Sequence, residues 1–246
     1  MIKWMEKLLR KGPPERPRCG AIVAAAGSSS RMGGENKLML PLEGIPVLAR
    51  TLLALEGSQL VDEIVVAVRE EDLLPVADLC KQFGVSKPVK IVRGGETRLA
   101  SVLAAAMECR EDMAFLAVHD GARPLADPAL IDSVIETAFR TNAAVPAVPV
   151  KDTIKIAAEG RVAGTPARET LRAVQTPQVF DAQLLRAALQ AAVDSGAEIT
   201  DDCSAVERLG KEVYLTEGSY ENIKITTPED LLLAEAILRK REEAGR

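Results

Sequence analysis

Short apolar runs alternate with longer amphipathic segments along the chain from Cys19 onward. The runs are rich in β-branched residues, as in Ile64-Val65-Val66-Ala67-Val68, and strands of this composition are usually covered on both faces. The amphipathic segments end at glycines such as Gly57 and Gly84. This alternation predicts repeated βα units and therefore a parallel sheet. We expect strands at residues 22–26, 64–68, 89–92, 114–118 and 143–148, and helices at 45–56, before 84, and at 99–109, 128–140, 182–194 and 231–243.

The alternation is interrupted after residue 148. Residues 151–156 and 161–165 predict two short strands joined through Glu159-Gly160, a hairpin with too few residues for a core of its own. Two interpretations remain open, because the hairpin either reaches across to a second subunit or folds back on its own domain. Residues 168–178 then return the chain to the main body.

Two further features are expected near the end of the chain. Thr200 or Asp201 is by default the N-cap of a helix, and residues 211–215 predict a late strand. Residues 222–230 predict another strand that leads into the final helix. Within it Lys224 alternates with two isoleucines, so its side chain points away from their face, in the direction of a ligand crevice.

The first apolar run ends in a glycine-rich turn that contains two cations. Ile22 to Ala26 is followed by Gly27 and three serines, and then by Arg31 and Lys37. A buried strand that ends in such a turn exposes backbone N–H groups, and with nearby cations this arrangement suits a polyphosphate. The spacing fits neither a Walker A loop nor the dinucleotide pattern G-x-G-x-x-G. A nucleoside triphosphate site is therefore one hypothesis, and a connection that binds nothing is the other.

Two later strands end in residues suited to the same ligand. Gly94 and Gly95 follow the third predicted strand, with Ser101 in the helix after them. Asp120 and Arg123 follow the fourth, where a carboxylate could help to hold Mg²⁺ and a cation could bind phosphate. Because ligands lie beyond the carboxyl ends of strands in open α/β sheets, these residues are expected to face one crevice. The alternatives are an ordinary helix-entry turn for the glycines and a turn-capping role for the carboxylate.

Composition excludes several classes of protein. The chain has 246 residues, of which 47% are hydrophobic but only 3% aromatic, so Ala, Val, Leu and Ile must build the core. A formal charge of −5 gives no reason to expect nucleic-acid binding. Four scattered cysteines and the single histidine, His119, exclude an ordinary Cys/His zinc cluster, and we expect a structural role for His119. Free thiols favour a cytoplasmic location.

The first eighteen residues are basic and rich in proline, with no apolar run long enough for a signal peptide. We expect residues 1–18 to form a poorly ordered arm. No apolar segment approaches the length of a membrane span, so we expect no membrane partner.

Taken together, these motifs resemble those of the 2-C-methyl-D-erythritol 4-phosphate cytidylyltransferases of the non-mevalonate isoprenoid pathway. The resemblance covers roughly residues 19–238 and rests on several signatures in the same order. These are Ala24-Ala25-Ala26-Gly27 with Arg31-Met32 and Lys37, Gly94-Gly95 with Arg98 and Ser101, His119-Asp120-Gly121-Ala122-Arg123-Pro124, Lys151-Asp152-Thr153, Thr176-Pro177-Gln178, Thr200-Asp201-Asp202, and Asn222-Ile223-Lys224-Ile225-Thr226. The sequence departs from the family pattern at Glu221, where an aspartate is often found.

The resemblance implies a Rossmann-like α/β fold, with a mostly parallel twisted sheet flanked by helices. It implies that residues 19–246 form one nucleotidyltransferase domain, with a protruding β-arm at about residues 150–166 that makes a homodimer and completes the partner's active site. Cytidine triphosphate (CTP) would be held by Ala25, Ala26, Gly27, Gly94, Gly95 and Ser101. Arg31 and Lys37 match transition-state stabilisers, and Arg168 and Lys224 match residues that position the acceptor. Further substrate contacts would come from Asp120, Arg123, Thr153 and Thr200, with Asp120 also as the Mg²⁺ ligand.

The expected reaction is attack by an acceptor phosphate oxygen on the α-phosphorus of CTP, with release of pyrophosphate. A phosphate monoester is already anionic near neutral pH, so the attack needs no general base. Catalysis then depends on alignment and on charge neutralisation. A ribitol 5-phosphate cytidylyltransferase is the nearest alternative enzyme. A catalytically silent nucleotide-binding scaffold is the alternative outside enzymes.

Overall fold

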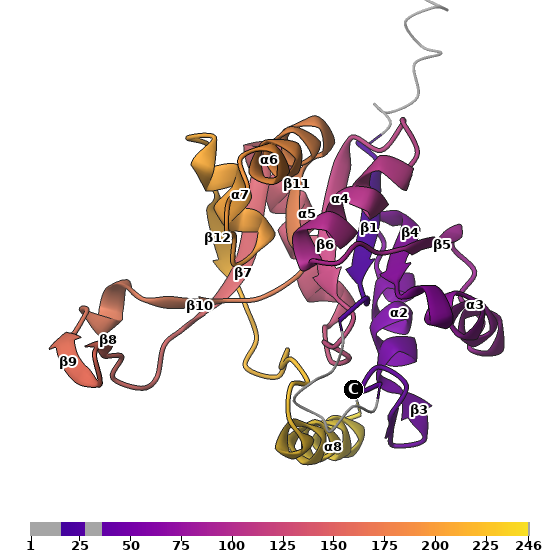
Figure 1. Cartoon of the computed structure of the whole chain (residues 1–246). Coiled ribbons are helices and arrows are strands. Elements are labelled where there is room, and N and C mark those ends of the chain that lie inside the picture. The colour runs from indigo at the N-terminus through magenta and orange to yellow at the C-terminus, as the bar shows by residue number, and fades with distance from the viewer. Residues whose placement is uncertain (1–15, 28–35, 246) are drawn as a thin grey trace, which may run out of the picture.

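A twisted sheet organises the described part of the chain, residues 16–27 and 36–245, in this computed structural model (Figure 1). Its strands run in the spatial order β10-β7-β11-β6-β1-β4-β5, with β12 also paired to β7. Their bounds are β1 (Cys19–Ala24), β4 (Val61–Val68), β5 (Val89–Arg93), β6 (Phe115–Asp120), β7 (Ala143–Pro149), β10 (Arg172–Val174), β11 (Gln178–Asp181) and β12 (Tyr214–Glu217). The strand pairs around β1 are parallel, and β11 lies antiparallel between β6 and β7. The expected Rossmann-like α/β fold with a mostly parallel sheet is confirmed.

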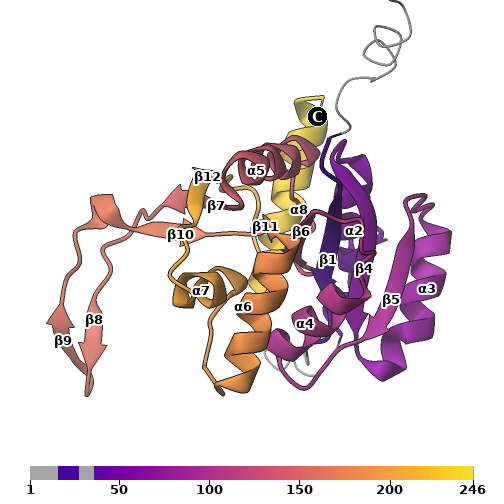
Figure 2. The same cartoon turned by 90° about the horizontal axis from the view of Figure 1, so that it is seen from above.

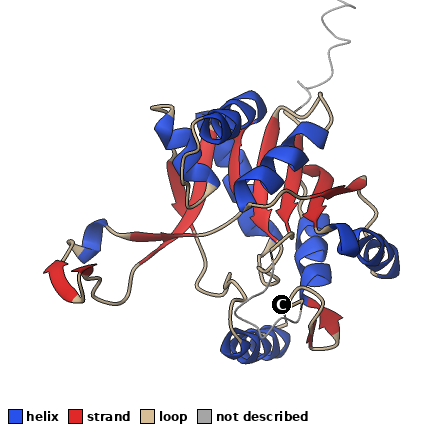
Figure 3. Cartoon of the chain, in the orientation of Figure 1, coloured by secondary structure: helices blue, strands red, loops and turns tan. Residues whose placement is uncertain are grey.

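Helices cover both faces of the sheet (Figures 1 and 3). Successive β1 residues enter different clusters, because Ala21 and Val23 pack on one face and Ile22 on the other. The first face is covered by α2 (Val47–Gly57), α3 (Leu73–Gln82), α5 (Pro128–Thr141) and α8 (Pro228–Glu243). The second is covered by α4 (Arg98–Glu108), α6 (Ala182–Asp194) and α7 (Asp202–Arg208). None of the helices in the described residues combines the length and apolar character that a membrane span requires.

A hairpin extends away from the sheet (Figures 1 and 2). It consists of β8 (Ile156–Ala158) and β9 (Arg161–Gly164), which pair only with each other, and is followed by a 3-10 turn at Arg168–Thr170. Almost all of its side chains are exposed, so it does not fold back on the body of its own chain. Residues 151–155, predicted as the start of a strand, are irregular. Another small hairpin, β2 (Pro41–Leu42) with β3 (Ile45–Pro46), precedes α2 and makes Pro46 its N-cap.

Two segments differ from expectation. The strand predicted at residues 222–230 is wrong, because these residues find no neighbouring strand. The N–H of Ile225 instead donates to Ala122, and the N–H groups of Thr226 and Thr227 donate to the Asp230 carboxylate. In the other segment, β10 and β11 were not expected, because strands of three and four residues are too short to show a clear alternation.

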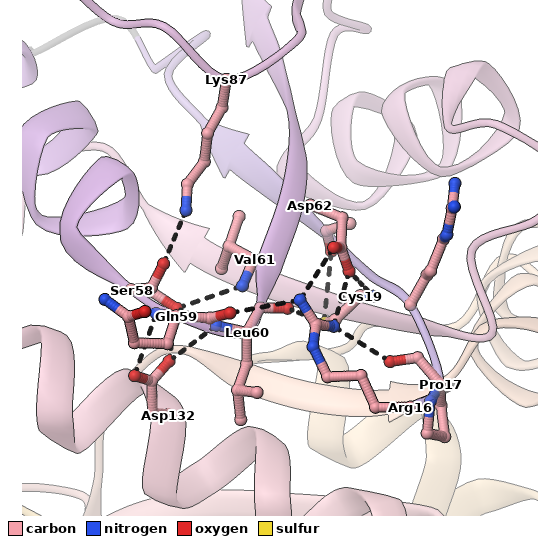
Figure 4. A network of polar contacts seen from close by, with 12 residues as sticks. Arg16, Pro17, Cys19, Ser58, Gln59, Leu60, Val61, Asp62, Lys87 and Asp132 are labelled. Carbon is pink, nitrogen blue, oxygen red and sulfur yellow. Dashed lines mark hydrogen bonds and ion pairs between the residues drawn. The ribbon is translucent and has the colours of Figure 1, made fainter. Parts of the chain in front are cut away.

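The chain enters the sheet through a network of polar contacts (Figure 4). The guanidinium of Arg16 makes two hydrogen bonds of 2.8 Å to the two carboxylate oxygens of Asp62, at the start of β4. Asp62 also accepts from the N–H of Cys19, the first residue of β1. Arg18 pairs with Asp112 at 2.7 Å. The last residues of the predicted basic arm are therefore bound to the body, while residues 1–15 lie outside the described part of the chain.

Candidate active site

The carboxyl ends of four parallel strands meet at one edge of the sheet. The register pairs Ala24 at the end of β1 with Asp120 at the end of β6, and Val68 of β4 with Arg93 of β5. The chain leaves β1 for β4 and β5, and then returns to β6 on the other side of β1. Ligands bind in open α/β sheets where the strand order reverses in this way. The region beyond Ala24 and Asp120 is thus where a substrate is expected.

Asp120 lies at the centre of a cluster of positive side chains. Its Oδ2 is 2.9 Å from Lys224 Nζ and 3.4 Å from Arg123 Nε, and its Oδ1 is 3.6 Å from Arg98 Nε. The three cations come from the start of α4, the loop after β6 and the segment before α8. One carboxylate that faces three cations leaves an excess of positive charge, which suits a phosphate group.

The charges of this cluster are fixed at neutral pH. Asp120 is only 7% exposed, and burial by itself would raise its pKa. The positive charges of Lys224, Arg98 and Arg123 outweigh burial and hold the pKa of this carboxyl well below its usual range. Burial lowers the pKa of Arg123, but a guanidinium stays protonated because its ordinary pKa lies far above neutrality.

Lys37, from the loop after β1, reaches the segment that contains Lys224. Its Nζ donates a hydrogen bond of 2.8 Å to the carbonyl oxygen of Ile225, the residue next to Lys224. The fold thus brings two of the predicted cations, Lys37 and Lys224, to the same stretch of main chain. Arg31, the predicted companion of Lys37, lies outside the described residues.

The predicted nucleotide-binding residues also converge. A Cβ atom added to Gly94 would lie 2.6 Å from Ala26 Cβ and 2.9 Å from Ser101 Oγ, so the loops after β1 and β5 touch at a position that only glycine can occupy. Ala25 is buried, and a Cβ on Gly27 would meet nothing within 4 Å. The Ser101 hydroxyl lies 2.8 Å from the Thr97 carbonyl oxygen and 3.2 Å from the Gly95 carbonyl oxygen, so it contacts the Gly94-Gly95 turn.

Thr176 and His119 hold the backbone of Asp120, a role that the sequence did not reveal. The N–H of Asp120 donates to Thr176 Oγ1 at 3.0 Å, and the same hydroxyl lies 2.9 Å from His119 Nδ1. His119 is fully buried, and burial lowers its pKa to about 4. The imidazole is therefore neutral near pH 7, and the structural role expected for it agrees with this position. The Thr176-Pro177-Gln178 motif is visible in the sequence, but no local pattern shows that Thr176 lies beside the end of β6.

Arg98 links Asp120 to a second buried carboxylate. Its Nη2 donates to Asp202 Oδ2 at 2.7 Å, and Asp202, the first residue of α7, is fully buried. Burial raises the pKa of Asp202, whereas the charge of Arg98 opposes that rise. The preceding residue, Asp201, caps α7 as expected and accepts from Gln178, while Thr200 is exposed. The Arg98–Asp202 pair was missed because its members lie on two helices far apart in the sequence.

Arg123 is held by the segment that contains Lys224. Its Nη1 donates to the carbonyl oxygen of Asn222 at 2.7 Å, and the Asn222 side chain donates to the Thr176 carbonyl at 2.9 Å. Asn222 is fully buried. The site is thus fastened on three sides, by the segments around Asp120, Thr176 and Lys224.

Two predicted residues are not brought to this cluster by their own chain. Thr153 and Arg168 are exposed, and they lie before β8 and in the 3-10 turn after β9. The hairpin of β8 and β9 extends away from the sheet (Figure 2). Arg168 Nη1 donates to the Lys151 carbonyl at 3.0 Å, which joins the two sides of the arm. Among residues 16–27 and 36–245, no group of three or more His, Cys, Asp or Glu side chains could hold a metal ion.

Comparison with known sequences gives a consistent result. The sequence model of the 2-C-methyl-D-erythritol 4-phosphate cytidylyltransferase family matches residues 19–240. A protein of that name from Dehalococcoides mccartyi is 45% identical over 224 residues, which are 91% of this chain and 97% of that protein. One from Bacillus cytotoxicus is 45% identical over 218 residues, 88% of this chain and 96% of the other.

Solved structures agree. The chain resembles 4-diphosphocytidyl-2C-methyl-D-erythritol synthase from Anaerococcus prevotii with a TM-score of 0.82 and 30% identity, covering 91% of this chain and 96% of that one. It resembles 2-C-methyl-D-erythritol 4-phosphate cytidylyltransferase from Thermus thermophilus with a TM-score of 0.75 and 35% identity, covering 89% and 98%.

Proposed function

The chain belongs to the 2-C-methyl-D-erythritol 4-phosphate cytidylyltransferase family, and from this premise we propose that its reaction takes place at the cation cluster around Asp120. The protein transfers CMP from CTP to 2-C-methyl-D-erythritol 4-phosphate, here called methylerythritol phosphate, in isoprenoid precursor biosynthesis. The products are 4-diphosphocytidyl-2-C-methyl-D-erythritol and pyrophosphate. The observation that carries the site assignment is the convergence of Lys37, Lys224, Arg98 and Arg123 beyond the ends of β1 and β6.

The chemistry suits a site made of cations. An oxygen of the acceptor phosphate forms a new bond to the α-phosphorus of CTP, and the bond to the pyrophosphate oxygen breaks. The nucleophile is already an anion, so no proton has to be removed. Accordingly the single histidine is buried, neutral and bonded to Thr176. The site lowers the barrier by aligning two anions that repel each other and by neutralising the charge that develops on oxygen.

Each predicted residue takes one part of this task. Lys37 and Arg31 stabilise the transition state, and Lys224 with Arg168 positions methylerythritol phosphate. Asp120, Arg123, Thr153 and Thr200 make further contacts with the substrates, and Asp120 also orients the cations around the acceptor. The loops that contain Ala26 and Gly94 touch each other and support a nucleotide site, because small residues there let backbone N–H groups approach a phosphate closely. Ala25, Gly27, Gly95 and Ser101 complete that site.

The position of Asp120 suits a magnesium ion whose other ligands come mainly from substrate phosphates and water. Its carboxylate is ionised, and its Oδ1 makes a loose 3.6 Å contact with Arg98. Mg²⁺ is commonly bound through one or two carboxylates, several waters and substrate phosphates, so it needs no dedicated cage of protein ligands. We propose Asp120 as its protein ligand. When bound, the ion would neutralise phosphate charge.

The extended hairpin supports a homodimer. Thr153 and Arg168, both assigned to the acceptor site, lie on the arm, and the arm exposes apolar side chains that its own chain does not cover, including Ile154, Ile156 and Val162. We propose that the arm packs against a second subunit and supplies these two residues to that subunit's site. Light scattering in solution should give the mass of a dimer.

The cysteines support a reducing compartment. The four cysteines are buried and free of disulfides. Disulfides are rare in the cytosol, so we propose a cytoplasmic location.

Pyrophosphate release from CTP, measured with each of two acceptors, tests the proposed function. We expect release with methylerythritol phosphate at a kcat/KM at least about tenfold above that with ribitol 5-phosphate. A preference for ribitol 5-phosphate would identify the alternative enzyme. No release with either acceptor, despite CTP binding, would support the silent scaffold.

A further inference from the structure

The segment that contains Lys224 is held by contacts with other parts of the chain and not by a neighbouring strand among the described residues. Residues 221–227 form no strand, and 40% of the Lys224 side chain is exposed. Its main chain is fixed at three places. The N–H of Ile225 donates to the Ala122 carbonyl at 2.8 Å, the Asp230 carboxylate accepts from Thr226 and Thr227, and the buried Asn222 is bonded to Arg123 and Thr176. Glu221, the first residue of the segment, adds a further contact on the side of α8.

Arg241, in the last turn of α8, holds Glu221 at the start of this segment, and the neighbouring Lys240 Nζ donates to Glu221 Oε1 at 3.0 Å. Arg241 Nε donates to Glu221 Oε2 at 3.0 Å, and its Nη2 donates to the carbonyl oxygen of Leu125 at 2.9 Å. The side chains of Arg241 and Glu221 are only 18% and 22% exposed, so this is a largely enclosed contact. Glu221, the residue that departs from the family pattern, thus faces α8.

The two groups that Arg241 joins belong to the two loops that supply cations to the site. Glu221 begins the segment of Lys224, and Leu125 follows Arg123 in the loop after β6. Arg123 itself donates to the Asn222 carbonyl at 2.7 Å, so the loops are tied together on the side of the site as well. A guanidinium has a rigid fork of donors, so it fixes the distance between its two acceptors in a way that a lysine cannot.

We propose that Arg241 is a positioning residue for the acceptor. It acts through Glu221 and the Leu125 carbonyl to hold Lys224 and Arg123 at their places around Asp120. Arg241 lies one residue beyond residues 19–240, the part of the chain that matches the family model. The inference rests on the proposed function, because the acceptor phosphate is what Lys224 and Arg123 are proposed to bind.

Kinetics of the Arg241→Ala variant of the full chain test the proposal. We expect the KM for methylerythritol phosphate to rise about tenfold, because small displacements of binding groups cost this much or more, while the KM for CTP changes less than about twofold. The KM of Arg241→Lys for methylerythritol phosphate should lie between those of the wild type and Arg241→Ala, since an ammonium can keep the contact with Glu221 but does not span both acceptors. The matched control is Arg239→Ala on the same helix, because Arg239 pairs with Glu43 and Glu235, and its kinetics should equal those of the wild type.

The wild-type protein must first release pyrophosphate with both substrates, so failure of the proposed function is detected separately. An unchanged KM for the acceptor in Arg241→Ala would overturn the positioning role. The positioning role would also be overturned if the KM values for CTP and for methylerythritol phosphate rose equally in Arg241→Ala and its Tm were lower. That result would indicate a general loss of stability. If Arg241→Ala does not fold, Glu221→Gln serves in its place, and it should raise the acceptor KM selectively or the proposal is wrong.

Discussion

The ammonium nitrogen of Lys224 lies 2.9 Å from Oδ2 of Asp120, and this contact joins the segment before the last helix to the end of β6. Asp120 also forms ion pairs with Arg123 and Arg98, so one carboxylate keeps three cations close together. Like charges at these distances repel, and the carboxylate offsets that repulsion until a phosphate arrives.

Removing the charge of Asp120 should therefore disperse the cluster. We expect Asp120→Asn to lower kcat/KM for methylerythritol phosphate by about 10²-fold or more, on the scale of other preorganised electrostatic groups. Circular dichroism should show an intact fold. A variant with wild-type kinetics for both substrates would contradict the assigned role.

The same variant should alter the acid stability of the protein. The pKa of Asp120 is lower in the folded state than the unfolded value of about 4, so its stabilisation is complete above that value and is lost as the pH falls below it. Denaturant unfolding at pH 5 and at pH 3 should show a smaller loss for Asp120→Asn than for the wild type. An equal loss would show that Asp120 is not preferentially ionised in the folded state.

His119 should make its own contribution to pH dependence. Its folded pKa of about 4 lies below the ordinary value of 6.5, so the unfolded chain binds the proton more readily between these values. Stability is therefore complete above about pH 6.5 and falls by up to about 3 kcal/mol as the pH drops toward 4. His119→Gln should remove this fall, as measured by urea unfolding. Because the imidazole is neutral and buried, His119 should contribute no titration to kcat near pH 6.5, so the pH profiles of kcat for the wild type and His119→Gln should coincide there.

The buried carboxylate of Asp202 should matter for stability and for the placement of Arg98. Asp202→Ala removes the 2.7 Å partner of a guanidinium that is 31% exposed. We expect a loss of about 2–3 kcal/mol in the free energy of unfolding, below the range for fully buried pairs because Arg98 still reaches solvent. The double variant with Arg98→Met should be more stable than Asp202→Ala, since no unpaired charge remains. Urea unfolding of both proteins decides this.

The sequence was most informative where a local pattern carries the structure. The strand from Ile64 to Val68 is almost wholly β-branched, and α6 was predicted with the bounds that it has, because Asp181 caps a clear helical pattern. Asp120 was found because it ends an apolar run. By contrast, the contacts of Arg98 with Asp202 and of Thr176 with Asp120 join segments that no periodicity connects, and residues 222–227 alternate like a strand although no neighbouring strand is available to them.

The turnover number of Lys37→Ala tests most directly whether cations from distant segments act on one phosphorus atom. Lys37 contacts the carbonyl next to Lys224, and it is assigned to the transition state. Its loss should raise the activation free energy for pyrophosphate release by roughly 2–4 kcal/mol, which lowers kcat about 30- to 1,000-fold. Lys81→Ala, which removes an exposed ammonium on α3, is the control and should keep wild-type turnover. The predicted result is a large fall in kcat for Lys37→Ala alone, and wild-type turnover in that variant would contradict the account.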